Sequence, residues 1–317
     1  MTPTWLRRRS ATLAGAVVLV VAGGIAPAQA ALPVSERAPA CLDPHTLGAG
    51  AKGGHARDKD HRDISAAEQR AIERRTQRIL AAERGSSKSL AGRPLDGTTV
   101  PVYVHVMAAA DGTGNVTDTQ IAQQIDVLNK TFGGAESREA SDTGFTFTLA
   151  GTDRYFNDAW HNDQNSNQYR KATRLGGADA LNIWLVEFNY LGIATFPWDY
   201  ANQGAIDGIR VLWSSLPGGT ENNYNLGETA THEAGHWFGL YHVFQGGCKE
   251  SQGGDMVADT PAQSTATNGC PEGQDSCAGG GLDSIHNYMD YSYDSCYDQF
   301  TADQTTRMDD MWTAYRS

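Results

Sequence analysis

Residues 232–242 read HEAGHWFGLYH, which places three histidines and a glutamate within eleven residues. His232 and His236 are four residues apart, so on a helix they lie one turn apart on the same face. Gly239 can end that helix because glycine accepts the left-handed conformation found at helix ends. The chain can then turn back and bring His242 to the same point. Three neutral imidazoles around one open position form the ligand set of a catalytic zinc site.

The N-terminus has the pattern of an export signal. Arg7, Arg8 and Arg9 precede an apolar run over residues 11–21, and APAQA at 26–30 ends in small residues. This pattern predicts a secretory signal peptide over residues 1–30, with cleavage after Ala30. The apolar run is short for a membrane span, and no later stretch qualifies. We therefore expect a secreted, extracellular protein without a membrane anchor, and the export route stays open.

Charge divides the chain into two parts. Residues 98–317 contain 10 Lys+Arg and 28 Asp+Glu, a net charge of −18, whereas residues 31–97 contain 12 and 9, a net charge of +3. An acidic domain argues against nucleic acid or an anionic membrane surface as a partner. It suits bound calcium and cationic peptide substrates. The same carboxylates also serve to keep a secreted protein soluble, and that alternative stays open.

Residues 31–97 are predicted to form a pro-segment ahead of a catalytic domain at 98–317. The stretch SAAE at 65–68 is a capping box, and the apolar residues that follow predict a helix ending at Gly85. Residues 85–97 are polar and rich in Gly and Ser, which is typical of a processing linker.

The catalytic segment alternates between strand and helix patterns. Strands are predicted at TVPVYVHVMA from Thr99, at FTFTLAG and ALNIWLVEF, at 191–197 and at 208–216, with a proline-ended edge strand at 191–197. A helix is predicted from Thr117 or Asp118 to Gly133. This order indicates a domain of the α/β (α+β) class.

The cysteines also divide. Cys248, Cys270, Cys277 and Cys296 follow the histidine motif, and in an oxidising compartment they allow three disulfide pairings. Cys41 stands alone upstream. A lipid attachment there is disfavoured because RAPAC lacks an aliphatic residue, and an intermolecular disulfide is a second reading. The third reading is favoured: as a thiolate in a removable segment, Cys41 fills the open zinc position of a zymogen.

A second motif follows the first. NYMDYS at 287–292 places Met289 and Tyr291 some fifty residues after the histidines. A methionine between tyrosines is ordinarily core packing, but together with HEAGHWFGLYH it matches the metzincin pattern of an extended zinc motif followed by a Met-turn. The stretches NLGETATHEAGHWFGLYHVFQGGC, DMVADTPA and HNYMDYSYDSCYDQFTADQTTRM, with VPVYVHV, LNIWLV and GIATFP upstream, resemble the pappalysin family of metzincins, closest to its small secreted microbial members. The resemblance covers nearly all of residues 98–314.

The resemblance implies a metzincin fold and a role for each motif residue. The fold would be a mixed twisted sheet with the active-site helix and a smaller, irregular, disulfide-stapled C-terminal subdomain. His232, His236 and His242 would hold zinc. Glu233 would be the general base that later protonates the leaving amine. Tyr291 would stabilise the oxyanion, and Met289 would form the floor beneath the histidines.

The resemblance also implies the disulfide pairing Cys248–Cys277 and Cys270–Cys296. Calcium is expected near GGDMVADTP at 253–261, where Asp255, Asp259, Thr260 and backbone carbonyls offer the oxygen ligands of a hard cation. Ordinary turns are the alternative for this stretch, because Asp and Thr before proline favour turns without metal.

The predicted function is a secreted zinc endopeptidase made as a zymogen, acting as a monomer on protein or peptide substrates. A substrate would bind antiparallel to the edge strand near Gly192–Phe196. Asp294 and Asp298 would line the pocket just past the scissile bond and favour arginine there. The alternative is a secreted metzincin-like binding module with structural zinc. Structural zinc normally has four protein ligands and no need of Glu233, so the intact motif favours the enzyme.

Overall fold

The computed structural model describes residues 64–85, 97–249 and 254–317. The predicted signal peptide, Cys41 and nearly all of the predicted processing linker lie outside the described residues.

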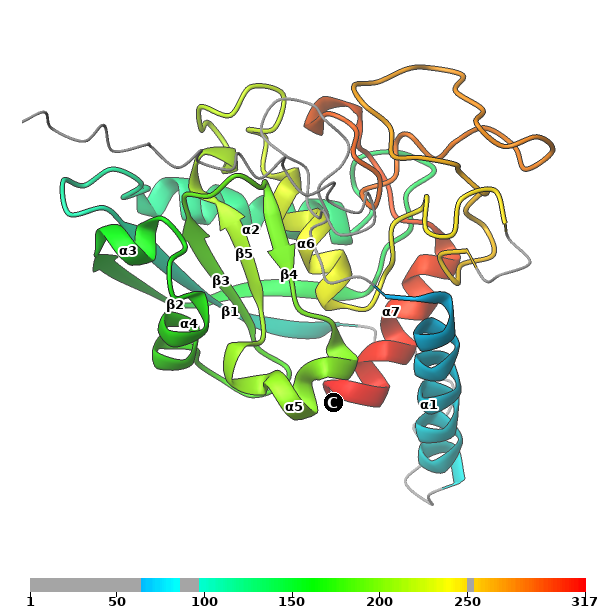
Figure 1. Cartoon of the computed structure of the whole chain (residues 1–317), viewed down its shortest axis with the longest axis horizontal. Helices are drawn as coiled ribbons and strands as arrows, with labels where there is room; N and C mark the ends of the chain where they lie inside the picture. The colour runs from blue at the N-terminus through cyan, green and yellow to red at the C-terminus, as the bar shows by residue number, and fades with distance from the viewer. Residues whose placement is uncertain (1–63, 86–96, 250–253) are drawn as a thin grey trace, which may run out of the picture. The chain divides into compact units, whose positions relative to one another are not determined.

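A five-stranded sheet forms the centre of the catalytic segment (Figure 1). The strand order is β2 (Phe145–Phe156), β1 (Thr98–Ala108), β3 (Leu181–Val186), β5 (Ile209–Leu212) and β4 (Gly192–Ala194). All neighbours are parallel except β4, which runs antiparallel to β5 at the edge of the sheet. All five predicted strands are therefore confirmed, and the proline-ended segment is the edge strand that its sequence predicts.

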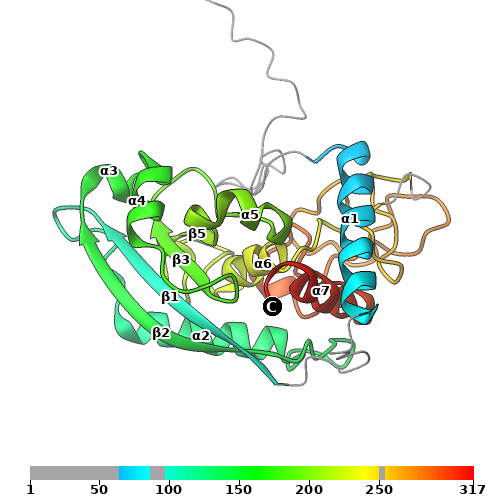
Figure 2. The same cartoon turned by 90° about the horizontal axis from the view of Figure 1, so that it is seen from below.

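Helices cover both faces of this sheet (Figure 2). The helices α2 (Asp118–Phe132) and α6 (Glu228–Trp237) pack on one face, where α2 contacts β2 and α6 contacts β4 and β5. Alternate β1 residues such as Val102 and Val104 belong to the same buried core. The helices α3 (Asp158–His161) and α4 (Ser166–Thr173) lie on the other face. The start of α2 is fixed by a capping box between Thr117 and Gln120, at the position the sequence predicts.

Two helices outside the sheet pack against each other. The helix α1 (Ala66–Gly85) contacts the C-terminal helix α7 (Ala302–Tyr315). The sequence predicts α1 from its capping box, and the Glu68 N–H does bind Ser65 Oγ at 3.2 Å. No prediction covered α7, although Thr301 and Gln304 form a second capping box at its start. The described residues also include the short helices η1 (Pro197–Asp199), α5 (Tyr200–Gln203), η2 (Gly204–Ile206), η3 (Trp213–Ser215) and η5 (Asp294–Cys296).

The segment from 254 to 301 has little regular structure, apart from η5 and two isolated bridges. Two disulfides, Cys248–Cys277 and Cys270–Cys296, cross-link it. The mixed α/β fold with an irregular, disulfide-linked C-terminal region is thus confirmed. Among the described residues, no helix is long and apolar enough to span a membrane.

Candidate metal centre and catalytic cleft

The metal site begins with the way in which α6 ends. Gly239 has φ +98°, and its N–H binds the carbonyl of His236 at 2.8 Å. The N–H of Leu240 binds the carbonyl of Gly235 at 3.0 Å. These two bonds form a Schellman motif, which stops the helix and reverses the chain. A side chain at position 239 would collide with Met311, 2.7 Å from an ideal Cβ, so both conformation and space require glycine.

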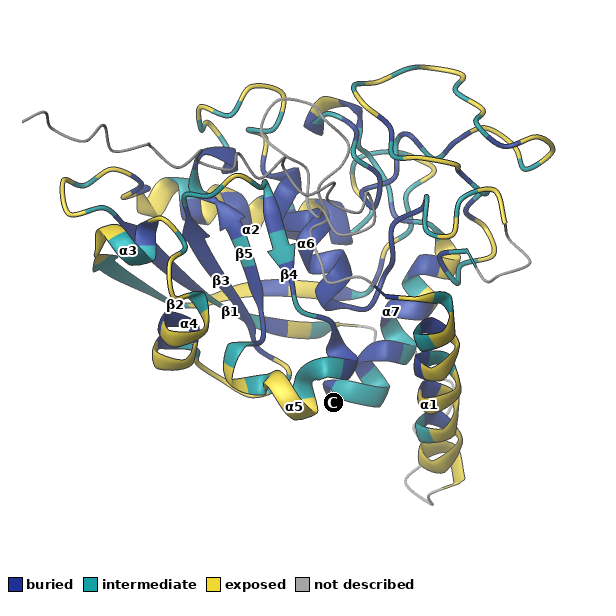
Figure 3. Ribbon diagram, in the orientation of Figure 1, coloured by how far each residue is buried: buried dark blue, intermediate teal, exposed yellow. Residues whose placement is uncertain are grey.

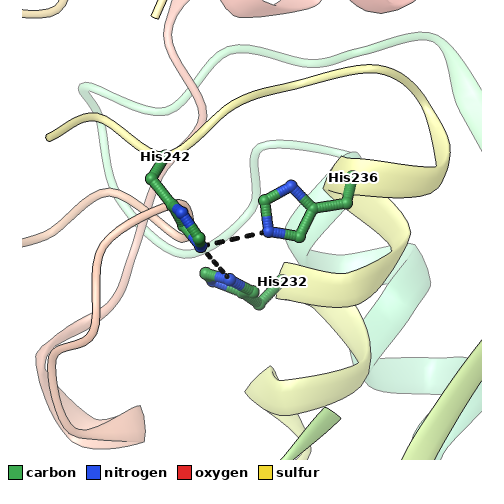
Figure 4. A group of neighbouring side chains, drawn as sticks. All are labelled: His232, His236 and His242. Carbon is green, nitrogen blue, oxygen red and sulfur yellow. Dashed lines mark hydrogen bonds between the residues drawn. The ribbon is translucent and has the colours of Figure 1, made fainter. Parts of the chain in front are cut away.

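The reversal brings the third histidine to the first two (Figure 4). Nε2 of His242 lies 3.3 Å from Nε2 of His232 and 3.2 Å from Nε2 of His236. All three side chains are buried: His232 is 7% exposed, His236 0% and His242 2%. The predicted convergence is therefore present in the structure, and the three rings together can hold a metal ion.

The hydrogen bonds of the rings fix which nitrogen faces the common point. Nδ1 of His232 lies 2.5 Å from the carbonyl of Tyr288, and Nδ1 of His236 lies 2.8 Å from the carbonyl of Leu240. A carbonyl only accepts, so both Nδ1 atoms carry the proton and both Nε2 atoms present lone pairs. Tetrahedral zinc with bonds of about 2.0–2.1 Å separates its nitrogen ligands by about 3.3 Å. The residues present therefore fit zinc in both donor type and spacing.

The Met-turn positions the ligands through its backbone. The carbonyl of Tyr288 orients His232, as described, and the carbonyl of Met289 accepts the N–H of Val243 at 3.2 Å, next to His242. Met289 is fully buried, and its Sδ lies 2.4 Å from where a Cβ on Gly235 would stand. Met289 thus packs directly against α6, called the zinc helix below because it carries His232 and His236, and Gly235 permits that close approach.

Glu233 lies in contact with the edge strand. It is 2% exposed, and its Cγ and Oε1 atoms lie 2.3 Å from the position that a Cβ on Gly192 would occupy. The backbone of β4 therefore packs against the Glu233 side chain with no room for any substituent. Glu233 also lines a pocket together with His232, so this residue adjoins both the metal site and the strand on which a substrate is expected to lie. No motif in the sequence predicts this contact between Gly192 and Glu233.

Tyr291 is half-buried beside the metal site. Its ring centroid lies 4.8 Å from that of His242 in an edge-on arrangement, and 5.7 Å from that of His232. Phe244 contacts both rings, with its centroid 5.1 Å from that of Tyr291 and 4.5 Å from that of His242. The phenol is thus at the rim of the site, where it can face a substrate.

A pocket opens beside His232 and Glu233. Its lining residues are Leu191, Tyr224, Glu228, Thr229, His232, Glu233, Tyr291, Asp294 and Tyr297. Of the two aspartates predicted to line it, only Asp294 does so. Asp298 is half-buried elsewhere, where its N–H binds the carbonyl of His286 at 2.9 Å. The helical turn η5 explains the difference, because it places these two residues, four apart in the sequence, in separate environments.

Asp294 also caps the zinc helix. The helix starts after Gly227, which has no side chain to cap it, and Asp294 Oδ2 accepts the N–H of Leu226 at 2.8 Å. Hydrogen bonds from the backbone of Gly227 and Glu228 also lower the pKa of this carboxyl, but burial outweighs them and raises it to about 7. A carboxylate at this end also interacts favourably with the helix dipole.

Glu228 is a second acidic residue in the pocket, which the sequence reasoning missed. It is 5% exposed, in the first turn of α6, and burial raises its pKa well above the ordinary value. Its position, four residues before His232 and on the same helix face, is the signal that could have identified it.

The disulfides have the pairing that the family resemblance implies. Cys270 and Cys296 also gather with His286 into a group of potential metal ligands. Both sulfur atoms are engaged in the disulfide, so this group does not offer thiolates to a metal ion.

The residues expected to bind calcium use their side chains within the protein. Asp255 accepts the Thr260 hydroxyl at 2.7 Å and the Val257 N–H at 3.0 Å. Asp259 accepts the Thr301 hydroxyl at 2.6 Å and the Asp303 N–H at 2.9 Å, at the start of α7. Asp255 and Asp259 do not gather into an acidic cluster in the described part of the chain.

Comparisons with known proteins agree with this geometry. A family model described as pregnancy-associated plasma protein-A, of the M43 peptidases, matches residues 152–313. An extracellular metalloprotease of Podospora anserina is 47% identical over 229 residues, covering 69% of this chain and 74% of that protein. Mature mirolysin of Tannerella forsythia, solved with a cleaved peptide, is 31% identical with a TM-score of 0.57, covering 67% of this chain and 90% of that one. Promirolysin, solved as a point mutant, is 27% identical with a TM-score of 0.61, covering 80% and 93%.

Proposed function

The chain belongs to the pappalysin family of zinc metalloendopeptidases, and on that premise we propose that it is an exported protease in which Glu233 is the general base and which is held latent by its pro-segment. The observation that carries the proposal is the convergence of the three histidines: Nε2 of His242 lies 3.3 Å from that of His232 and 3.2 Å from that of His236, and Glu233 lines the same pocket as His232. The experiment that tests it is cleavage of casein by the processed wild type and by Glu233→Ala, both loaded with zinc.

His232, His236 and His242 would hold zinc through their Nε2 atoms. Zinc, when bound, polarises the scissile carbonyl and lowers the pKa of a water ligand toward ~7. The backbone carbonyls of Tyr288 and Leu240 keep two of the imidazoles in the tautomer that this requires.

Glu233 would move the proton. Its carboxylate takes a proton from the attacking water and delivers it to the amine nitrogen that leaves. The packing of Gly192 against the Glu233 side chain supports this role, because it restricts the position of the carboxylate. Tyr291, at the rim of the site, would donate its hydroxyl to the developing oxyanion.

A substrate would extend the sheet at β4. Leu191 and Thr195 direct their backbone hydrogen bonds toward β5, through the pairs with Leu212 at 2.8 Å and Gly208 at 3.1 Å. In an antiparallel pair the bonding residues alternate, so Gly192 and Ala194 direct their N–H and C=O groups away from β5. These groups can pair with an extended peptide, which then passes over Glu233.

Preference for arginine after the cut would come from Asp294. This residue lines the pocket beside His232, and its ionised carboxylate can form a charge-assisted hydrogen bond with a guanidinium. Burial favours the uncharged acid at Glu228, so Asp294 supplies the charge and Glu228 an additional oxygen. Asp298, which was expected to share this role, lies outside the pocket and has no part in the proposal.

Latency would come from the pro-segment. Residues 98–317 are 220 of the 317 residues, about 69% of the chain, so a match of 80% to promirolysin includes residues that precede 98. The corresponding match to mature mirolysin covers 67%. This difference supports residues 31 to about 97 as a removable segment, and we propose Cys41 as its zinc ligand from the sequence alone.

Calcium remains part of the proposal in a restricted form. Binding at Asp255 and Asp259 requires both carboxylates to exchange the hydroxyl and N–H donors that they now accept. A rise in Tm on adding calcium, absent in Asp255→Asn, would support the site. An unchanged Tm in the wild type would remove calcium from the account.

A further inference from the structure

The helix α1 presents one buried face to the catalytic segment. Its buried residues recur on one side, toward α7, and the rest of the helix is largely exposed (Figure 3). Gln69 Nε2 donates to the carbonyl of Gly254 at 2.8 Å, and the Thr76 hydroxyl lies 2.8 Å from that of Tyr315. Both Gln69 and Thr76 are nearly inaccessible to solvent, at 2% and 1%. Buried hydrogen bonds from Gln69 and Thr76 therefore fix where α1 docks on the rest of the chain.

A first line of contacts runs from α1 to the end of the zinc helix. Glu73 Oε1 pairs with Nη2 of Arg307 at 2.8 Å, and Nε of the same guanidinium donates to the carbonyl of Gly239 at 2.9 Å. Arg307 is 7% exposed and lies over the ring of Tyr241, 4.9 Å from its centroid. Gly239 ends α6 and Tyr241 directly precedes His242. One buried cation thus joins α1 to the turn that carries the third histidine.

A second line of contacts is apolar. Ile64 and Ile72 belong to one buried cluster together with Phe196, Trp198, Tyr241 and Met311. The ring of Phe196 stands edge-on to His236, with centroids 5.6 Å apart, and packs against Tyr241 at 5.8 Å. The cluster therefore contacts His236 directly and includes Tyr241, the residue before His242.

We propose that α1 is a positioning helix for the metal site: its docking on the face formed by α7 and Tyr241 holds the Gly239 turn, and with it His242, in the zinc-binding arrangement. The proposal rests on the proposed function in taking the three histidines as the zinc ligands and α1 as part of the pro-segment. It assigns the pro-segment a second role beyond latency. The chain retains zinc most tightly while α1 is docked, and loses this support when the helix is removed.

The test measures zinc release from the full chain. A Cys41→Ser/Glu233→Ala background prevents self-processing and leaves the histidines as the ligands under study. Zinc transfer to a chromogenic chelator is timed at a temperature well below Tm. Glu73→Gln removes the charge that Arg307 faces while keeping the side-chain shape, and we expect release to become about five- to tenfold faster.

Two further variants of α1 test whether faster zinc release comes from loss of the Glu73–Arg307 contact or from looser packing of the helix in general. Glu83→Gln makes the same substitution at an exposed position and should leave release unchanged. Thr76→Val loosens α1 through its contact with Tyr315, without touching Arg307, and should lower Tm with a smaller effect on release. Equal acceleration by Thr76→Val and Glu73→Gln at equal loss of Tm, or no acceleration by Glu73→Gln, would overturn the proposal. Because zinc release is measured without cleavage, the result stands whether or not the processed chain is a protease.

Discussion

At position 192 glycine is required because a neighbouring side chain leaves no room for a Cβ, and not because of the backbone conformation. An ideal Cβ there would lie 2.3 Å from Glu233, and φ is not in the left-handed region. Gly192→Ala should therefore fold normally and retain zinc, but displace the carboxylate and lower kcat/KM by about 10²-fold, the size expected for misplacing a catalytic group by about 1 Å.

Gly280→Ala is the matched control for this substitution. Its nearest neighbour is 3.6 Å from an ideal Cβ, which is ordinary contact, and its φ is likewise unrestricted. Steady-state kinetics and zinc content of both variants decide the matter. Wild-type activity in Gly192→Ala would show that Glu233 does not depend on this contact.

The raised pKa of Asp294 leads to a prediction of how the preference for arginine after the cut depends on pH. Burial raises its pKa to about 7, so the carboxyl is mostly neutral at pH 6 and mostly ionised at pH 8. Only the ionised form pairs with a guanidinium, and the ratio of cleavage before arginine to cleavage before leucine should rise as pH increases through 7. The ratio cancels any pH dependence shared by both substrates. Asp294→Asn should make it flat, whereas a ratio that falls with pH in the wild type would refute the role.

Residue types and spacing predicted the three histidines and the left-handed Gly239, because these follow from helix periodicity and from one sterically special residue. Spacing could not distinguish Asp294 from Asp298, since the intervening η5 turn is irregular. Spacing also could not predict the contact of Gly192 with Glu233, because this contact depends on how β4 packs against α6.

At the scale of elements, the zinc helix is held at both ends by other parts of the chain. Asp294 accepts N–H groups at its start. At its other end, Arg307 and Arg316 of the C-terminal segment donate to the carbonyls of Gly239 at 2.9 Å and Trp237 at 3.0 Å. Negative charge at the start and positive charge at the end both match the helix dipole.

At the scale of elements we predict that Arg316 contributes strongly to the stability of the fold. It is 2% exposed, lies 3.5 Å over the ring of Trp237, and pairs with Asp207 at 3.0 Å. Arg316→Gln leaves Asp207 buried without its main cation and should lower the free energy of unfolding by about 3 kcal/mol. Arg138→Gln, at an exposed position, should change it little. Chemical denaturation of both variants tests this, and equal stabilities would contradict it.

Periodicity predicted the elements whose apolar residues repeat cleanly, namely α1, α2 and the strands. The helices α3 and α4 were not predicted, because their short, polar sequences bury only a few side chains. The helix α7 escaped although TADQ at 301–304 is a recognisable capping box.

For the whole molecule, the proposed latency is the property that would separate a precursor from the processed protease. Cys41→Ser should give a precursor that is active or processes itself early, since the open zinc position then lacks its thiolate. Incubation of purified precursor, followed by gel analysis and a peptide assay, compares it with the wild type. The two described disulfides occupy all four other cysteines, so Cys41 is expected to keep its thiol. Cys41 found in a disulfide with one of them would contradict the zinc-ligand role, because it would then have no thiolate to offer.

The central claim is that three histidines hold zinc while Glu233 moves the proton. The most direct measurement determines zinc content and peptide cleavage together in processed wild type and Glu233→Ala. Both should contain about one zinc per chain, and the variant should lose activity by a factor on the order of 10³, as for loss of a general base. A zinc-loaded wild type that cleaves no protein or peptide, or a Glu233→Ala variant that retains full activity, would contradict the account.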